Sequence, residues 1–419
     1  MVLKYDSSGV LLWQRFFSGA GFTPDEGVCV VTDSKNNVII GANYWNAQPP
    51  GGSDFAIFKY DPSGKLLWSE TFDGPDHSAD ETEAILVSSA DEIYLVGTTY
   101  SNFNGYDIAV LKYSDSGSLL WSKIHNDSLN SVDIAYSIIS DNDNNIYVGG
   151  LSSGKMLILK MKPNGTIIRK IKQQYMSAEF MYKDQNSNFY VTGFGSQLNI
   201  TGYRTIKYDS TGSIIWSNVY GGLDNLNNFP KSQAINHNGF VGVTGRSISS
   251  PLQYYDFATV MYDHNGSEIG SKRFGRPYFT EETAGCGFDS SGNLYVAGYY
   301  QPGGTSEDYC LIKYASAIGI TPISVEIPSH FSLSQNYPNP FNPATKICFS
   351  IPAVETTRRV AILKIYDVLG NEVTTLVNQQ LTPGTYSVDW DASNHPSGVY
   401  FYRLTAGEFI QTNKMILLK

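Results

Sequence analysis

Acidic side chains recur at one position of a repeated sequence pattern, and carboxylates are the residues here with the clearest capacity for chemistry. Two repeats carry no acid at this position and have Met176 with Ser177, or Asn228 with Phe229, instead. Hard cations such as Ca²⁺ prefer carboxylate oxygens. The pattern therefore indicates an acidic arc that binds Ca²⁺ or a cationic ligand, with a merely solvated acidic rim as the alternative. The candidate residues are Asp25, Glu26, Asp80, Glu81, Asp133, Glu281 and Glu282.

Other catalytic patterns are missing from the sequence. The six histidines are scattered without metal-ligand spacing, and there is no nucleophile elbow, phosphate-binding loop or Cys-x-x-Cys pair. The sequence thus favours a binding scaffold over an enzyme and predicts no cofactor other than a possible Ca²⁺. A carbohydrate-active hydrolase or lyase that uses the acidic residues stays open as the alternative, because glycoside cleavage needs only two suitably placed carboxylates.

The acids sit in a repeating framework. The phrase Lys-Tyr-Asp-x-x-Gly recurs with variation from positions 4, 59, 112, 160, 207, 261 and 313. These intervals of about 50 residues are typical of a four-stranded propeller blade. The first full repeat divides into strand-like runs near 27–33, 37–42, 55–60 and 66–72. Strands that open each repeat are expected nearest the propeller axis, which would place the acids at one mouth of the central channel.

The fold class is therefore predicted to be all-β, with a β-propeller over residues 1–318. Pairing of the run at 11–17 with the run at 309–314 would close a ring of six blades, with the run at 2–5 left over. Seven blades or an incomplete ring are the alternatives. Four tryptophans at one equivalent position of the fourth run are expected to pack between blades: Trp13, Trp68, Trp121 and Trp216.

Two stretches in these repeats are similar to a known repeat class. The phrase from Asp54 to Gly64 and the phrase Gly-Ser-Leu-Leu-Trp-Ser at 117–122 resemble the bacterial SBBP-type β-propeller repeat. The resemblance extends over residues 1–318. It implies a propeller but no particular activity, since propellers host many functions.

The composition changes after Gly319. Residues 319–333 are predicted to be a linker, and 334–419 contain short β-runs and turns that predict a small immunoglobulin-like sandwich. Several motifs there resemble the type A C-terminal sorting domain of the type IX secretion system. They are Asn-Tyr-Pro-Asn-Pro-Phe-Asn-Pro at 336–343, Ile-Tyr-Asp-Val-Leu-Gly at 365–370, Pro-Gly-Thr-Tyr at 383–386, Ser-Gly-Val-Tyr at 397–400 and the terminal Lys-Met-Ile-Leu-Leu-Lys. The resemblance implies partnership with the type IX machinery and cleavage by a surface sortase-like protease.

Charge and hydropathy limit the partners and the location. The net charge of −10 and the pI near 5.1 argue against nucleic acid, since phosphate binding needs clustered Lys and Arg. The sequence contains no run of eighteen apolar residues, so it predicts no transmembrane helix. The N-terminal residues lack the features of a signal peptide, which predicts an incomplete N-terminus. We expect an extracellular or outer-membrane-surface protein with an unknown glycan or protein ligand.

Overall fold

The structure is a computed structural model, and its described residues form strands and turns without a helix. They are 1–17, 25–46, 52–101, 105–127, 131–222, 228–236, 238–249, 254–275, 280–290, 292–300, 308–314, 321–324, 328–352, 360–380, 383–392 and 395–418. The chain divides into two compact units. The first comprises Met1–Gly287 with Val296–Leu311, and the second comprises Phe288–Tyr295 with Ile312–Lys419.

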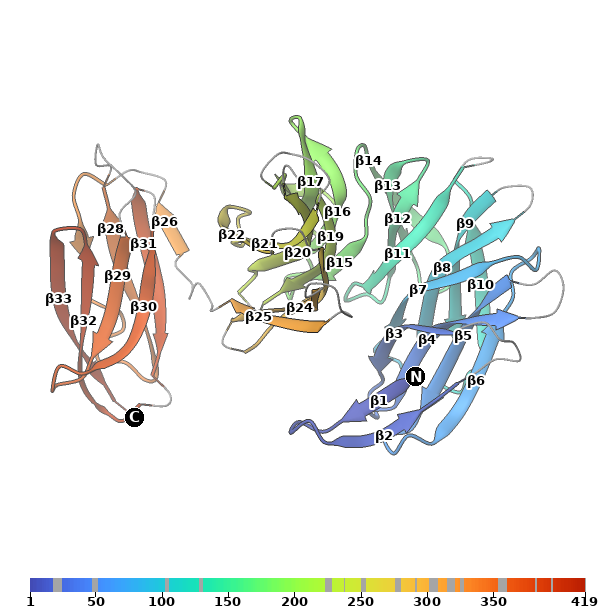
Figure 1. Cartoon of the computed structure of the whole chain (residues 1–419), viewed down its shortest axis with the longest axis horizontal. Helices are drawn as coiled ribbons and strands as arrows, with labels where there is room; N and C mark the ends of the chain where they lie inside the picture. Colours follow the sequence, from blue (N-terminus) through green and yellow to red (C-terminus); the bar gives the residue numbers. More distant parts are fainter. Residues whose placement is uncertain are drawn as a thin grey trace. The chain divides into compact units, whose positions relative to one another are not determined.

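Five four-stranded antiparallel sheets follow one another along the chain, and each is a meander whose strand order is the chain order (Figure 1). Their strands are β3 (Glu26–Thr32), β4 (Val38–Asn46), β5 (Gly52–Tyr60), β6 (Leu66–Phe72), β7 (Asp80–Val87), β8 (Ile93–Ser101), β9 (Gly105–Tyr113), β10 (Leu119–His125), β11 (Asp133–Ser140), β12 (Ile146–Ser152), β13 (Lys155–Met161), β14 (Ile167–Gln173), β15 (Phe180–Lys183), β16 (Phe189–Gln197), β17 (Ile200–Tyr208), β18 (Ile214–Tyr220), β19 (Asn228–Ile235), β20 (Val241–Ser249), β21 (Tyr254–Tyr262) and β22 (Glu268–Phe274). These strands match the runs predicted from the repeat.

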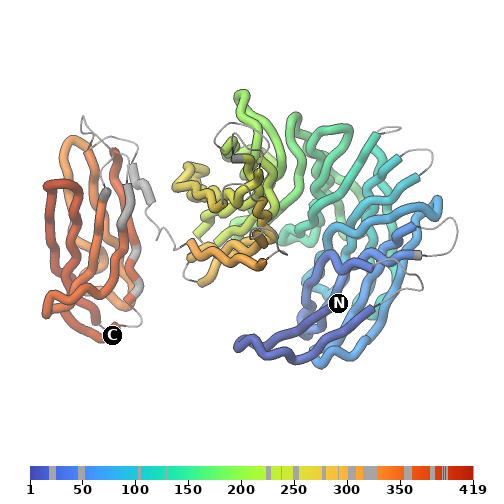
Figure 2. The backbone as a smooth tube through the Cα atoms, viewed as in Figure 1, coloured from blue at the N-terminus to red at the C-terminus, as the bar shows by residue number. Residues whose placement is uncertain are grey.

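Partial sheets stand at both ends of this series. β1 (Val2–Tyr5) pairs with β2 (Leu11–Arg15), and β23 (Glu281–Phe288), β24 (Leu294–Tyr300) and β25 (Asp308–Tyr314) form a three-stranded sheet. Through the five complete sheets, the first strand of each sheet contacts the first strand of the next, which is a propeller-like arrangement. Figure 2 follows the same path from blue to yellow.

The ring closure predicted from the sequence is not formed among the described residues. β2 is hydrogen-bonded to β1, and no ladder joins it to β25. In each complete sheet the fourth strand pairs with the third. β2 corresponds to a fourth strand, and β1, the run left over in the predicted ring, pairs with it as the third strand. Trp13 on β2 is then buried against Val38, Ile40 and Tyr60 of the next sheet. The number of blades stays a prediction.

The four tryptophans pack between consecutive sheets, as predicted. The indole nitrogen of Trp68 donates a hydrogen bond to the backbone oxygen of Asp115, at 3.0 Å, in the last turn of the following sheet. In the same turn Gly117 has a φ of 93°, and a Cβ there would come within 2.8 Å of the Trp68 ring. Glycine is therefore required twice, for its backbone angle and for the approach of the ring. The same indole bond joins Trp13 to Pro62, Trp121 to Pro163 and Trp216 to His264.

The lysine of the repeated phrase fastens the same boundary. Lys59 has a side chain only 2% exposed, and its Nζ lies 2.8 Å from the Asp33 carboxylate and also pairs with Asp115. Burial of Asp33 acts to raise its pKa, but hydrogen bonds from Lys59 and Asn37 outweigh burial and hold the pKa at about 2. Asp33 also accepts hydrogen bonds from the backbone of its own turn. Asp33 therefore has a structural role.

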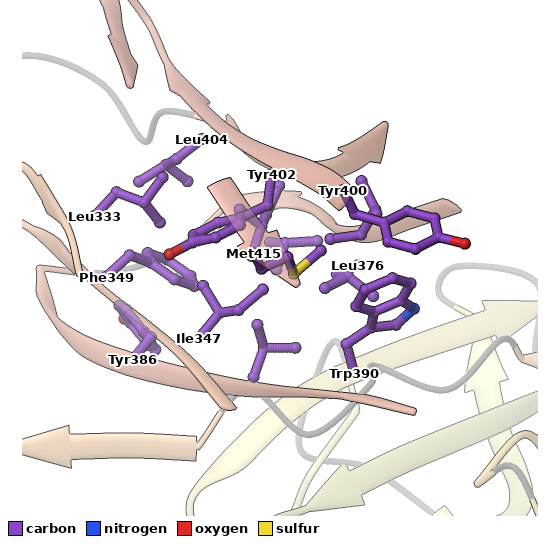
Figure 3. Close-up of a cluster of buried hydrophobic side chains, with 14 of the residues drawn as sticks. Leu333, Ile347, Phe349, Leu376, Tyr386, Trp390, Tyr400, Tyr402, Leu404 and Met415 are labelled. Carbon is purple, nitrogen blue, oxygen red and sulfur yellow. The ribbon is translucent and has the colours of Figure 1, made fainter. Parts of the chain in front are cut away.

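The second unit contains two four-stranded sheets. One has the order β26 (Thr321–Ser324), β31 (Gly384–Asp391), β28 (Ala344–Ile351), β27 (Ser332–Leu333), and the other has the order β30 (Glu372–Gln380), β29 (Val360–Tyr366), β32 (Gly398–Ala406), β33 (Phe409–Leu417). Their core joins Phe349 and Trp390 from the first sheet with Tyr402 and Met415 from the second (Figure 3). β26 and β27 lie within the segment predicted to be a linker. The immunoglobulin-like class of this sandwich stays a prediction.

The proline-rich motif of this unit holds the last strand in place. The Asn336 side chain is buried and donates hydrogen bonds to the Pro338 oxygen at 3.1 Å and to the Thr345 hydroxyl at 2.9 Å. The Phe341 backbone bonds Ile416 and Leu418, at 3.0 Å each. Several residues that distinguish this motif therefore serve the fold, since they tie the C-terminal strand to the sandwich.

Replacing Trp68 with alanine is expected to lower the free energy of unfolding by about 3 kcal/mol, the low end for a large aromatic truncation because the ring is partly exposed. Urea denaturation of the full chain measures the change. Leu67→Ala is the control, since this neighbouring side chain is 47% exposed, and it should change the value by less than about 0.5 kcal/mol. A Trp68→Ala protein as stable as wild type would contradict the assigned role.

Candidate functional site

The structure separates the seven predicted acids into two sets by burial. Asp80, Asp133 and Glu281 are fully buried at the first residues of β7, β11 and β23. The other four, Asp25, Glu26, Glu81 and Glu282, are exposed or half-buried. Alternation explains why Glu81 and Glu282 differ from their buried neighbours Asp80 and Glu281, because successive side chains of a strand point to opposite faces. Asp25 is equivalent to Asp80 but precedes β3 and is half-buried. The sequence predicts all seven on one rim, whereas in the structure three of them are buried between neighbouring sheets.

The buried acids fasten the connection from the preceding sheet. Asp80 accepts a hydrogen bond from the Gly74 backbone at 2.6 Å, and Asp133 accepts one from the Asp127 backbone at 2.7 Å. Asn228, which holds this position in another sheet, donates to the Gly221 oxygen at 2.7 Å. Burial raises the pKa of Asp80 to about 6, and the neighbouring carboxylates Asp54 and Asp73 add to the effect.

The exposed acids lead to a residue that the sequence interpretation missed. Glu83 lies two residues beyond Glu81 on β7, as the extra residue of a β-bulge between Thr82 and Ala84. Burial raises the pKa of Glu83 to about 7, and the negative charges of Glu81 and Glu26 contribute. The Glu-x-Glu spacing at 81–83 is the signal that could have found it.

Tyr136 and Glu179 extend the row of polar side chains that begins with Glu81 and Glu83 on β7 across the next two sheets. Tyr136 lies on β11, and Glu179 directly precedes β15. The pKa of Tyr136 is raised first by burial and then by the negative charges of Glu179 and Glu83. Glu179 is held in place, since its Oε1 accepts hydrogen bonds from the Ser177 hydroxyl at 2.6 Å and the Phe194 backbone at 3.1 Å.

A cleft of about 470 Å³ adjoins this row, where two repeats lack the acids. The rings of Phe194 and Phe229 stack with centroids 4.8 Å apart, and the Tyr175 side chain is 71% exposed. Of these rings, Phe229 holds a position where other repeats carry a carboxylate, while Phe194 comes from the second strand β16 and Tyr175 directly precedes Met176. The lining residues are Tyr136, Leu151, Gly154, Tyr175, Met176, Ser177, Glu179, Phe194, Gly195, Ser196, Thr201 and Phe229.

Arg246 supports the far wall of the cleft. Its guanidinium lies 5.1 Å from the centre of the Phe229 ring and 2.7 Å from a carboxylate oxygen of Glu282. Glu282 also accepts a hydrogen bond from the Tyr299 hydroxyl at 3.1 Å. The charge of Glu282 is therefore balanced inside the protein. Asp25, another of the predicted acids, accepts a hydrogen bond from the Trp45 backbone at 3.1 Å.

A second cleft, of about 440 Å³, lies at the turns that carry the repeated lysine. Its central polar groups already serve the sheet boundary. Lys207 donates to the His264 oxygen at 3.4 Å and lies 4.9 Å from the centre of the Tyr190 ring. Asp184 accepts hydrogen bonds from the backbone of its own turn. These groups are less available to a ligand than those of the first cleft.

Residues 335–418 match the family model for a secretion system C-terminal sorting domain. This match agrees with the type IX motifs found in the sequence, and it implies secretion to the cell surface or the extracellular space. The described residues contain no helix that could span a membrane. No curated protein sequence matches the chain.

Several solved structures are similar in strand arrangement. A protein from Lactobacillus plantarum has a TM-score of 0.44 and 13% identity, over 85% of this chain and 99% of that one. A polysaccharide lyase described as an ulvan lyase has a TM-score of 0.43 and 11% identity, over 80% and 92%. The β-propeller domain of the trilobed protease from Pyrococcus furiosus has a TM-score of 0.41 and 8% identity, over 78% and 89%. At these scores no activity transfers to this chain.

The raised pKa of Glu83 predicts a loss of stability between about pH 4.5 and pH 7. The folded state favours the protonated carboxyl, so stability is full below the unfolded pKa and falls as the pH rises through the folded pKa. Glu83→Gln should therefore gain on the order of 1–2 kcal/mol over wild type at pH 8, after discounting for solvent screening, and nothing at pH 4. Thermal unfolding across this range measures it. The control Glu268→Gln, at an exposed site on β22, should follow wild type, and an unaltered pH profile for Glu83→Gln would refute the assignment.

Proposed function

We propose that this chain is an exported, non-enzymatic binding protein whose propeller-like unit holds a glycan in the cleft beside Tyr136 and Glu179. The observation that carries the proposal is the lining, which combines aromatic rings with a few fixed polar groups. Ligand sites typically have this composition. The apolar faces of a sugar ring pack on aromatic rings, and its hydroxyls donate to carboxylates such as that of Glu179.

The charge near the cleft favours one kind of glycan. Glu81 is exposed on β7, which contacts β11 of the cleft, Glu26 is exposed on β3 of the preceding sheet, and the whole chain carries a net charge of −10. This potential repels sulfated or uronic-acid polymers and attracts neutral or amine-bearing sugars. The exposed predicted acids thus act as an electrostatic filter for the ligand.

The C-terminal unit supplies delivery in this proposal. It carries the chain through the type IX machinery and is removed by a surface sortase-like protease, as its resemblance to type A sorting domains implies. The repeats of the exported part are of the SBBP type, and the sandwich is immunoglobulin-like. A surface protein of this design holds its ligand outside the cell.

An enzyme that acts on carbohydrate is the second candidate, and Glu83 is the observation that favours it. A carboxyl whose pKa is raised to about 7, with a second carboxyl close by, is the arrangement that acid–base catalysis on glycosides requires. Incubation with polysaccharides separates the two functions. Release of sugars that Glu83→Gln abolishes, while binding persists, would favour the enzyme over the binding protein.

Tyr175→Ala should weaken glycan binding about three- to tenfold, because it removes a largely exposed ring from the cleft without disturbing the core. Calorimetry with the full chain, on ligands found by a glycan array, measures the change. Tyr182→Ala is a matched control, since this tyrosine is 46% exposed but lines the other cleft. Equal affinity of Tyr175→Ala and wild type, or binding to no glycan at all, would exclude this site.

Deleting residues 335–418 from the gene in its native host should abolish surface exposure of the propeller-like unit and leave it inside the cell envelope. Fractionation with antibody detection measures its location. A deletion of equal effect on stability but outside this segment is the control for misfolding. Undiminished surface exposure after the deletion would contradict the role of the sorting domain.

A further inference from the structure

We propose a Ca²⁺ site between the sheets β3–β6 and β7–β10, formed by Asp54, Asp73 and Asp80. Each of these carboxylates offers one oxygen, and the three oxygens lie within 4.8 Å of one another. Asp54 lies on β5, Asp73 directly follows β6, and Asp80 begins β7. The cluster therefore joins one sheet, the connection that leaves it and the first strand of the next sheet.

A buried oxygen without a partner gives independent support for a ligand here. Asp80 is 0% exposed, and its Oδ1 has no hydrogen-bond partner among the described residues. Its Oδ2 is occupied by the Gly74 backbone. Asp73 repeats the pattern, since its Oδ1 is also buried without a partner while His77 takes its Oδ2 at 2.6 Å. Native proteins seldom leave buried acceptors unsatisfied, because each costs free energy, and a cation would satisfy both.

Gly74 shows how closely the groups converge. A Cβ at this residue would come within 2.4 Å of the Thr99 hydroxyl and 2.7 Å of Asp80 Oδ1. Thr99 is also the residue opposite Asp80 in the β7–β8 ladder. The backbone therefore passes close beside the carboxylates, and a side chain at this residue would clash with them.

The boundary of Asp107 and Asp133 also keeps two buried carboxylates, but the residue directly after β10 is Asn126 where Asp73 follows β6, so the third carboxylate is missing. Two further boundaries balance their charge differently. Between β21 and β23, Asp256 and Glu281 hold the equivalent positions, and Arg273 lies 3.0 Å from the Asp256 carboxylate. At another boundary the equivalent residues are Lys155 and Met176, so both acids are replaced together. At the boundary between β3–β6 and β7–β10 the sequence instead adds a third carboxylate, Asp73. This increases the negative charge that a bound cation would balance.

The chemistry of the donors favours Ca²⁺. All three donors are carboxylate oxygens, which suit a hard cation, and Ca²⁺ accepts irregular geometry completed by water more readily than Mg²⁺ does. Extracellular Ca²⁺ sites commonly have Kd values of about 0.1–1 mM. Bound there, the ion would link three segments: β5, β7 and the connection that follows β6. It would thereby stabilise the packing of two sheets.

Calorimetric titration of the chelator-treated full chain with CaCl₂ tests the site. Wild type should bind one Ca²⁺ with a Kd of about 1 mM or tighter, and saturating Ca²⁺ should raise its unfolding temperature. Asp73→Asn, at a partly exposed position where the amide keeps the shape of the side chain, should weaken binding at least tenfold and remove the thermal shift. Asp107→Asn changes the residue equivalent to Asp54 in the next sheet and should bind Ca²⁺ as wild type does.

Two results with wild type and Asp73→Asn would overturn the proposal. One is the absence of both heat and thermal shift for wild type at about 10 mM Ca²⁺, far above the expected Kd. The other is Ca²⁺ binding by Asp73→Asn with wild-type affinity, which would place the ion elsewhere. Asp80→Asn provides a second variant, because it keeps the shape of the buried side chain while it removes a ligand charge. Unchanged affinity of this variant would exclude the cluster in the same way.

Discussion

The packing of each sheet against the next is the constraint on which the first unit depends. A four-stranded sheet with two apolar faces must be covered on both, so its neighbours have to approach closely along the whole length. The repeat meets this need at one end with a tryptophan ring that lies on a glycine of the next turn. A buried lysine pairs with turn carboxylates of its own and the neighbouring sheet at the same end. These contacts recur because each sheet repeats the same problem.

The opposite ends of the sheets meet the same constraint with buried carboxylates and amides, and this explains why acids in sequence register do not form one surface. Asp80 and Asp133 are buried and hold the connections between sheets, while Glu81 is exposed and Glu83 is half-buried. Where the repeats depart from the acidic pattern, aromatic residues line a cleft beside Glu179. The variation among repeats, rather than their shared sequence, therefore creates the surface suited to a ligand.

Much of the fold follows from local sequence. The strands, the glycine turns and the packing role of Trp68 could be predicted because spacing and residue type determine them within one repeat. The motifs at 336–343 and 383–400 likewise identified the sorting domain. The ring closure failed because β1 and β2 pair with each other, a choice between partners that repeat alignment does not resolve. Glu179 and Asp73 were missed because their importance depends on side chains from neighbouring sheets.

The central claim is that the departures from the acidic pattern form the ligand site of an exported protein. Hydrogen–deuterium exchange of the full chain, with and without a neutral or amine-bearing oligosaccharide that binds it, tests this most directly. The account predicts slower exchange in the segments around Tyr136, at 175–179 and around Phe194 and Phe229. Protection confined to the turns near Lys207 and His264, or no protection in either region, would contradict it.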